Sequence, residues 1–127
     1  MHYISAEDVR QKAEEIVQTL GMWHIDMNRV HFVRSEGSKS KWVQARIHGM
    51  GRIWFHALGI PPHYVIEVIS ERYDTSTDEV KEKIIIHELL HIPRGFSGGF
   101  VCHKRGVTKK HVEKLYDCLR EGKISRD

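Results

Sequence analysis

Three residues in the stretch IIIHELLHIPRGFSGG (84–99) could carry out metal chemistry: His87, Glu88 and His91, spaced as H-E-x-x-H. Residues four apart project from the same face of an α-helix, so the two imidazoles can aim at one ion. Neutral imidazole is a good zinc ligand. Glu88 lies about 100° further round the helix, where its carboxylate could accept a proton from a water that zinc activates. This division of labour is typical of H-E-x-x-H metalloproteases.

A catalytic zinc keeps three protein ligands and one open position, so the motif predicts a third ligand elsewhere in the chain. The next histidine is His103, which follows a glycine-rich loop (94–106) that could fold back over the ion. Alternatives to it are His111, Glu113 and, as a minor candidate, Cys102. Zinc is the expected metal, although histidine nitrogens also suit nickel, copper and iron.

The segment that carries the motif is apolar nearly all round, which predicts a buried helix. Its apolar residues are Val80, Ile84, Ile85, Ile86, Leu89 and Leu90. Two buried histidines and a glutamate would be costly without partners, and a metal ion removes that cost. The competing interpretation, two core histidines hydrogen-bonded to backbone, is therefore the weaker one.

Three helices are predicted to position these groups. The first begins at Ser5, paired with Asp8 as a weak cap, and ends at Gly21. The second begins with a capping box, Ser76 with Glu79, and runs to His91, and Pro93 prevents its continuation. The third begins near Thr108 and ends at Gly122.

Short apolar or alternating runs between the first two helices predict strands at 29–35, 42–48, 52–58 and 63–71. The second and third runs are expected to pair as a hairpin around the GMG turn (49–51). Because the strands cluster instead of alternating with helices, the pattern predicts an α+β fold with a small mixed or antiparallel sheet of three to four strands and three main helices.

The chain has 127 residues, which predicts a single domain over 1–127. It has no apolar run long enough for a membrane span and no signal-peptide pattern at its start, so we expect a cytoplasmic protein. Cys102 and Cys118 read as free thiols. Positive charge is concentrated in residues 101–127, with 8 Lys/Arg against 4 Asp/Glu, which could meet nucleic acid or an acidic substrate.

Three segments resemble the metallopeptidase family found in archaea and phages: RIWFHALGIPPHYVIEVISERYD, KEKIIIHELLHIPRGFSGGFVCHKR and VTKKHVEKLY. The resemblance extends from about Arg52 to Tyr116 and is most specific around HELLHIP and FSGG. It implies a compact zincin-like domain that hydrolyses peptide bonds, with His87, His91 and His103 on the metal and Glu88 beside it.

The same resemblance suggests how a polypeptide would bind. In zincin-like enzymes an edge strand beside the active helix pairs with the extended substrate, and by similarity the segment His63–Ser70 would do so here, through His63, Tyr64 and Val65. A donor is also needed for the oxyanion. The candidates are His63, Arg94 and Tyr116.

The leading hypothesis is therefore a zinc-dependent peptidase with a polypeptide substrate and Glu88 as general base. A metal-dependent nuclease, with the basic C-terminal segment holding phosphates, is the first alternative. Glu88 inside the motif speaks against it, because a peptidase uses that carboxylate directly. A non-catalytic zinc-binding module is the second alternative.

Overall fold

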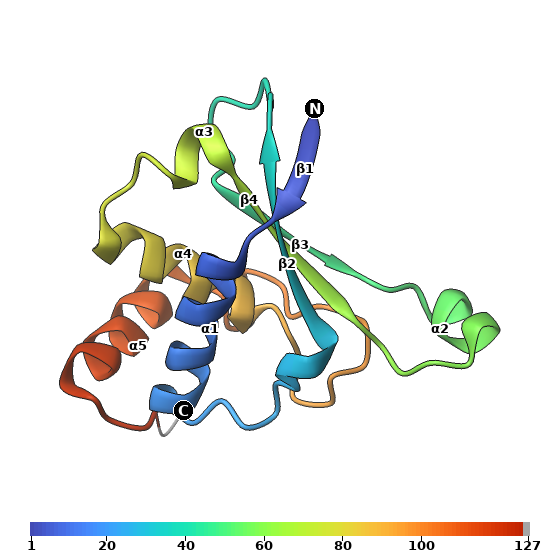
Figure 1. Cartoon of the computed structure of the whole chain (residues 1–127). Helices are drawn as coiled ribbons and strands as arrows, with labels where there is room; N and C mark the ends of the chain where they lie inside the picture. Colours follow the sequence, from blue (N-terminus) through green and yellow to red (C-terminus); the bar gives the residue numbers. More distant parts are fainter. Residues whose placement is uncertain (126–127) are drawn as a thin grey trace.

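The structure, a computed structural model, describes residues 1–125 and shows a mixed four-stranded sheet with three long helices packed on one of its faces (Figure 1). The strands are β1 (His2–Ser5), β2 (Val30–Glu36), β3 (Ala45–Gly49) and β4 (Tyr64–Ile69). The long helices are α1 (Glu7–Leu20), α4 (Asp78–Leu90) and α5 (Lys109–Glu121). Two short helices, α2 (Arg52–Leu58) and α3 (Ser70–Tyr73), and a 3-10 turn (Met27–Arg29) complete the described part. The predicted α+β class with three main helices is confirmed.

The strand order is β1-β2-β4-β3. β1 pairs antiparallel with β2, with Ser5 opposite Val33. β2 runs parallel to β4, and β3 pairs antiparallel with β4, with Ile47 opposite Ile66. β4 is therefore an interior strand, whereas β1 and β3 form the two edges of the sheet.

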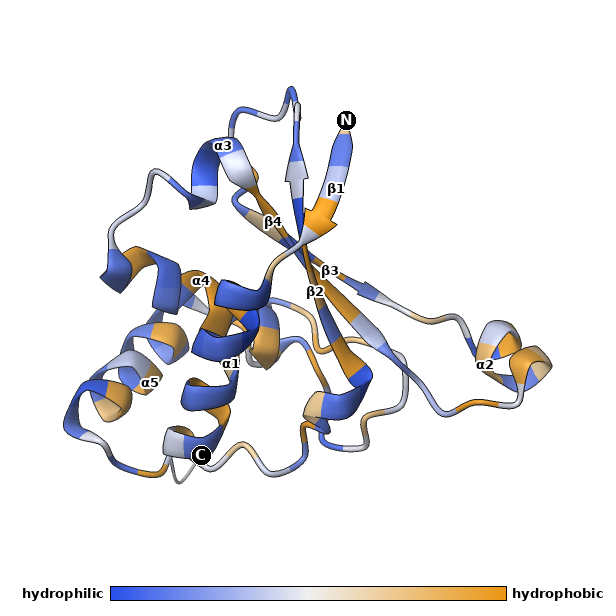
Figure 2. Ribbon diagram, viewed as in Figure 1, coloured by the Kyte–Doolittle hydropathy of each residue, from blue (hydrophilic) through white to orange (hydrophobic). Residues whose placement is uncertain are grey.

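The hydrophobic core lies between the sheet and the long helices. β4 contributes Tyr64, Ile66 and Val68 to it, all fully buried, and much of this strand is coloured apolar in Figure 2. α4 contacts α1, α5 and β3, so it is enclosed on several sides. Its three consecutive isoleucines, residues 84–86, are buried, as expected for a helix that is apolar nearly all round.

Both helices that flank α4 follow the sequence pattern closely. The stripe Val9, Ala13, Ile16, Val17 and Leu20 of α1 is buried, and Gly21 closes the helix at φ +71°. In α5 the Thr108 hydroxyl caps the first turn by accepting from the His111 amide. Gly122 ends this helix in the left-handed conformation, as predicted.

Two predicted helix starts are wrong. Ser5 belongs to β1, and α1 begins after Ala6, which makes no side-chain cap. The cap of α4 is Thr77, whose hydroxyl accepts from the Val80 amide, and not Ser76. Glu79 does not reach back to a cap but accepts from Lys83 at 2.8 Å. At α1 the pairing of Ser5 with Val33 keeps that residue in the sheet, and at α4 the adjacent hydroxyls of Ser76 and Thr77 compete for the cap.

The predicted strand over 52–58 is also wrong, because these residues form α2. Gly59 ends this helix at φ +68°, and the Ile60 amide bonds back to the Phe55 carbonyl, a Schellman-type closure. The predicted hairpin is therefore absent, and β3 pairs with β4 instead. α2 stands away from the sheet and helices at the end of an arm (Figure 1), and none of its residues is buried.

The described helices are all too short or too polar to cross a membrane.

Candidate metal centre

The last two turns of α4 present two histidines on one face. His87 lies within the helix and His91 is its C-cap residue, still at helical angles (φ −70°, ψ −17°). The two ring centroids are therefore only 5.1 Å apart. Pro93 follows at once and prevents a further turn, so the chain leaves the helix directly beside the two imidazoles.

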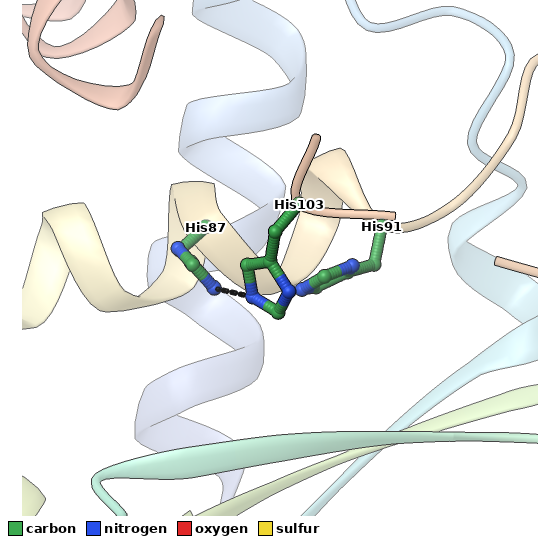
Figure 3. A group of neighbouring side chains, drawn as sticks. All are labelled: His87, His91 and His103. Carbon is green, nitrogen blue, oxygen red and sulfur yellow. Dashed lines mark hydrogen bonds between the residues drawn. The ribbon is translucent and has the colours of Figure 1, made fainter. Parts of the chain in front are cut away.

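The chain after α4 returns and brings His103 against the same two rings (Figure 3). Nε2 of His103 lies 3.3 Å from Nε2 of His87, and its ring centroid is 4.7 Å from that of His91. Each of the three histidines offers a nitrogen within 4.8 Å of the other two. Three imidazole nitrogens this close form a donor set that suits zinc and similar ions.

The returning loop is attached to the end of α4 by two hydrogen bonds between the same two residues. The Val101 amide donates to the His91 carbonyl at 2.8 Å, and His91 Nδ1 lies 2.7 Å from the Val101 carbonyl. A carbonyl can only accept, so Nδ1 carries the proton and Nε2 keeps its lone pair for a ligand. Such an outer hydrogen bond is the usual way of orienting a metal-binding histidine.

The sheet supports the same loop from below. The Tyr64 hydroxyl donates to the Gly99 carbonyl at 2.7 Å and accepts from the Gly98 amide at 2.9 Å. Gly49 of β3 and Gly98 approach so closely that a Cβ built on Gly49 would lie 2.5 Å from the Gly98 carbonyl oxygen. Glycine at these positions therefore lets the loop lie directly on the sheet.

Burial sets the proton affinities of the centre. It raises the pKa of Glu88, which is 7% exposed, to about 7. It lowers the pKa of His87 to about 4, with the neighbouring His91 and His103 imidazoles acting in the same direction. His87 is therefore neutral at physiological pH, as a metal ligand must be. Oε2 of Glu88 lies 4.0 Å from Nε2 of His87, close to the cluster without being part of it.

A groove of about 640 Å³ opens beside the cluster, between β3 with the residues before it and the helices α4 and α5. His87, Glu88 and His103 contribute to its wall. The apolar part of the wall consists of Trp42, Val43, Ala45, Val80, Ile84, Val107 and Val112. Lys83, Lys109 and Glu113 add charge, and Lys83 is paired with both Glu79 and Glu113.

The structure thus brings together the four residues that the sequence placed at the centre, His87, Glu88, His91 and His103. None of the three alternative ligands joins the cluster among the described residues: Cys102 is exposed, and Glu113 lines the same groove without belonging to the histidine group. His111 directs Nδ1 to the Gly106 carbonyl at 2.7 Å, and Glu113 pairs with Lys83 at 2.9 Å.

The residues predicted to contact substrate do not line this groove in the part of the chain described. The edge-strand interpretation of His63–Ser70 is wrong, because β4 is paired on both sides and has no free backbone edge. His63 lies 2.9 Å from His31, and Val65 is half-buried between its paired neighbours. The buried Tyr64 holds the loop in place instead of facing solvent.

The two oxyanion candidates from the helical region also lie apart from the groove. Arg94 borders a different cavity, of about 450 Å³, together with Trp23 and His24. Tyr116 is 9% exposed, and the Lys83 ammonium sits 4.9 Å from the centre of its ring. Their roles in oxyanion stabilisation stay predictions.

Sequence reasoning missed the wall opposite α4. Trp42 lies outside the regular part of β3, and it is 89% exposed at the rim of the groove. The available signal was an aromatic residue in an otherwise polar stretch, GSKSKWVQ (37–44). The predicted strand over 42–48 gave Trp42 no particular role, because the approach of β3 to α4 depends on contacts distant in sequence.

A comparison with protein families finds one match, to a family described as "Putative phage metallopeptidase", which covers residues 1–120. No curated protein and no solved structure matches the chain.

Proposed function

The chain belongs to this phage metallopeptidase family, and from that premise we propose that it is a zinc-dependent peptidase in which His87, His91 and His103 hold the metal and Glu88 is the general base. The observation that supports the proposal best is the convergence of three imidazole nitrogens within 4.8 Å beside a buried carboxylate. Three protein ligands with one open position is the arrangement that catalytic zinc sites use.

The residues present fit a zinc ion. His91 keeps Nε2 available because Nδ1 is bonded to the Val101 carbonyl, and His87 is neutral at physiological pH. A zinc ion held by the three nitrogens would supply Lewis acidity, which polarises a peptide carbonyl and makes water more acidic.

Glu88 is suited to move the proton. Its pKa of about 7 means that it exchanges a proton readily near neutrality, which is the condition for efficient general acid–base catalysis. It can accept the proton of the attacking water and then donate it to the departing amine. A cation in the cluster would lower this pKa and favour the ionised, proton-accepting form.

β3 is an edge strand, so it has free backbone groups that could pair with a substrate, whereas β4 is paired on both sides. The Ile69 amide donates to the Gln44 carbonyl, which fixes which β3 residues bond to β4. By the alternation of an antiparallel pair, the amides of Ala45 and Ile47 point away from β4, and they have no partner within residues 1–125. We propose that an extended polypeptide adds to this edge and so passes the metal centre.

The test of the proposed function is Glu88→Gln, assayed on casein as an unstructured substrate. The variant should bind zinc as tightly as the wild type and lose at least about 100-fold in cleavage rate, the lower end of what a general base contributes. The matched control is Glu82→Gln on the same helix, which should cleave normally. Cleavage of RNA but not casein by the zinc-loaded wild type would replace the peptidase with a nuclease.

A further inference from the structure

We propose that the groove beside the metal centre selects polypeptide segments that place a large apolar side chain against Trp42 and carry carboxylates beside it. This inference rests on the proposed function, because it names the class of substrate for the same site. It adds a specificity that neither the motif nor the family description contains.

Trp42 carries the apolar half of the inference. It is the most exposed large apolar residue of the described chain, at 89%, although it borders a groove whose other lining is largely apolar. A tryptophan left in water at the mouth of an apolar groove gains burial when a ligand covers it, and such residues dominate binding energy at interfaces. The facing wall is also apolar. Val80 and Ile84 of α4, Val112 of α5 and Val107, just before α5, contribute to it.

The size of the groove supports a side chain with its flanking backbone. About 640 Å³ lies within the range of sites that enclose drug-sized ligands, which is larger than one side chain needs. The free edge of β3 runs along the same wall, since Ala45 belongs to both. A strand added there would therefore direct alternate side chains into the groove.

The predicted preference for carboxylates rests on the charges around the groove. Exposed lysines adjoin the groove lining in two places: Lys39 and Lys41 in the segment that leads to Trp42, and Lys109 with Lys110 at the start of α5. The carboxylates of the lining are Glu88, which is buried, and Glu113, which is paired with Lys83. Lys109 lines the groove itself and has no ion pair among the described residues. Exposed lysines beside the groove attract carboxylates, so the substrate should be acidic.

A polypeptide fits these features better than a nucleic acid. Single strands of RNA or DNA need successive aromatic platforms, whereas among the described residues Trp42 is the one tryptophan, tyrosine or phenylalanine that borders the groove. An apolar wall and an open strand edge are instead what an extended peptide uses.

The apolar half is tested by peptide binding in the Glu88→Gln background, with zinc bound, so that binding is measured without cleavage. The probes are fluorescently labelled peptides with a central leucine or a central alanine, each flanked by glutamates. Fluorescence anisotropy should show at least about tenfold tighter binding of the leucine peptide, and Trp42→Ala should remove that preference. Trp54→Ala, at a tryptophan 64% exposed on α2, is the control and should leave it intact.

The preference for carboxylates is tested by reversing the charge of Lys109, with Arg52 as the matched control. Each is the exposed first residue of a helix. Glutamate there favours the helix dipole, so neither variant should unfold. Lys109→Glu should weaken binding of the glutamate-flanked leucine peptide several-fold and strengthen binding of a lysine-flanked one. Arg52→Glu should change neither affinity.

Several results would overturn the inference. Equal affinity for leucine and alanine peptides would remove the apolar subsite, and equal effects of Lys109→Glu and Arg52→Glu would reduce the charge preference to net charge. Displacement of the peptide by a single-stranded RNA, weakened by Lys109→Glu but not by Trp42→Ala, would assign the basic surface to nucleic acid.

The failure of this inference differs from failure of the proposed function. If the peptides bind as expected but the wild type cleaves neither them nor casein, the peptidase proposal is wrong and the binding preference holds. If the wild type cleaves casein but Trp42→Ala and Lys109→Glu cleave all three peptides at equal rates, the preference is wrong and the peptidase proposal holds.

Discussion

α4 and α2 are both apolar helices that carry histidine, yet their surroundings are opposite. α4 is enclosed by α1, α5 and β3, and Ile85, Ile86 and Leu89 are fully buried. α2 buries no residue, and Ile53, Trp54 and Leu58 are 59–77% exposed at the end of its arm (Figure 2). The difference teaches that apolar composition does not by itself build a reactive site. His87 and His91 become a candidate metal centre because the packing around α4 desolvates them and the following loop brings His103 to them, whereas His56 in α2 belongs to no such cluster in residues 1–125.

The largest expected effect is on folding, from truncating the same residue type in the two helices. Leu89→Ala should lower the free energy of unfolding by about 2–5 kcal/mol, because it leaves a cavity in the core. Leu58→Ala should change it by less than about 0.5 kcal/mol, because Leu58 is 59% exposed. Urea denaturation followed by circular dichroism measures both. A similar loss for the two variants would mean that α2 is covered in solution.

The next effect is on metal binding. His103→Ala should weaken zinc affinity by more than about 100-fold, beyond what changes to outer-shell groups cost. His56→Ala, an exposed histidine on α2, should leave the affinity unchanged. Isothermal titration calorimetry gives the affinities. Zinc should also raise the melting temperature of the wild type and of His56→Ala more than that of His103→Ala.

A smaller effect should follow from loosening the support of the loop. Tyr64→Phe removes the hydroxyl that bonds to both Gly98 and Gly99, so the free energy of unfolding should fall by about 1–3 kcal/mol. Zinc affinity should fall too, but less than in His103→Ala. Tyr3→Phe, at a tyrosine 60% exposed, serves as the control. An unchanged zinc affinity in Tyr64→Phe would show that the loop keeps its path without the sheet.

The smallest expected effect is on the stability of the fold at acidic pH. Hydrogen bonds from Arg34 lower the pKa of Asp8 below its ordinary 3.8, and Arg34 also binds Asp74. The stabilisation from Asp8 is therefore complete above the ordinary carboxyl pKa and is lost as the pH falls through the lower, folded-state value. This pair ties α1 to the sheet, and α2 contains no carboxylate. Asp8→Asn should flatten the pH dependence of the melting temperature in this acidic range, and an unaltered profile would contradict the assignment.

The parts of the fold that the sequence predicted are those with local causes. Four-residue spacing places His87 and His91 on one face of a helix, Pro93 ends that helix, and Thr108 begins the next one. Each of these signals acts within one or two turns of the backbone. The grouping of His103 with the helix was predicted from its position after the glycine-rich loop, and the bonds at Val101 show why the loop returns.

The parts that were not predicted depend on contacts distant in sequence. RIWFHAL (52–58) has the apolar content of a strand, and only its glycine boundaries indicate a helix. All four residues of β1 are exposed, so no burial pattern marks the strand. The parallel pairing of β4 with β2 has no local signal, and it is this pairing that places β4 inside the sheet and leaves β3 at the edge.

The paired hydrogen bonds between His91 and Val101 hold the third imidazole near the other two through the polypeptide alone. The conformational entropy of the loop is therefore lost when the protein folds and not when an ion binds. An ion can leave without a rearrangement of the backbone. In the proposed metalloenzyme, the identity of the bound metal would depend on the supply of ions around the protein and on the Irving–Williams order, and withholding zinc would switch the protein off while leaving it folded.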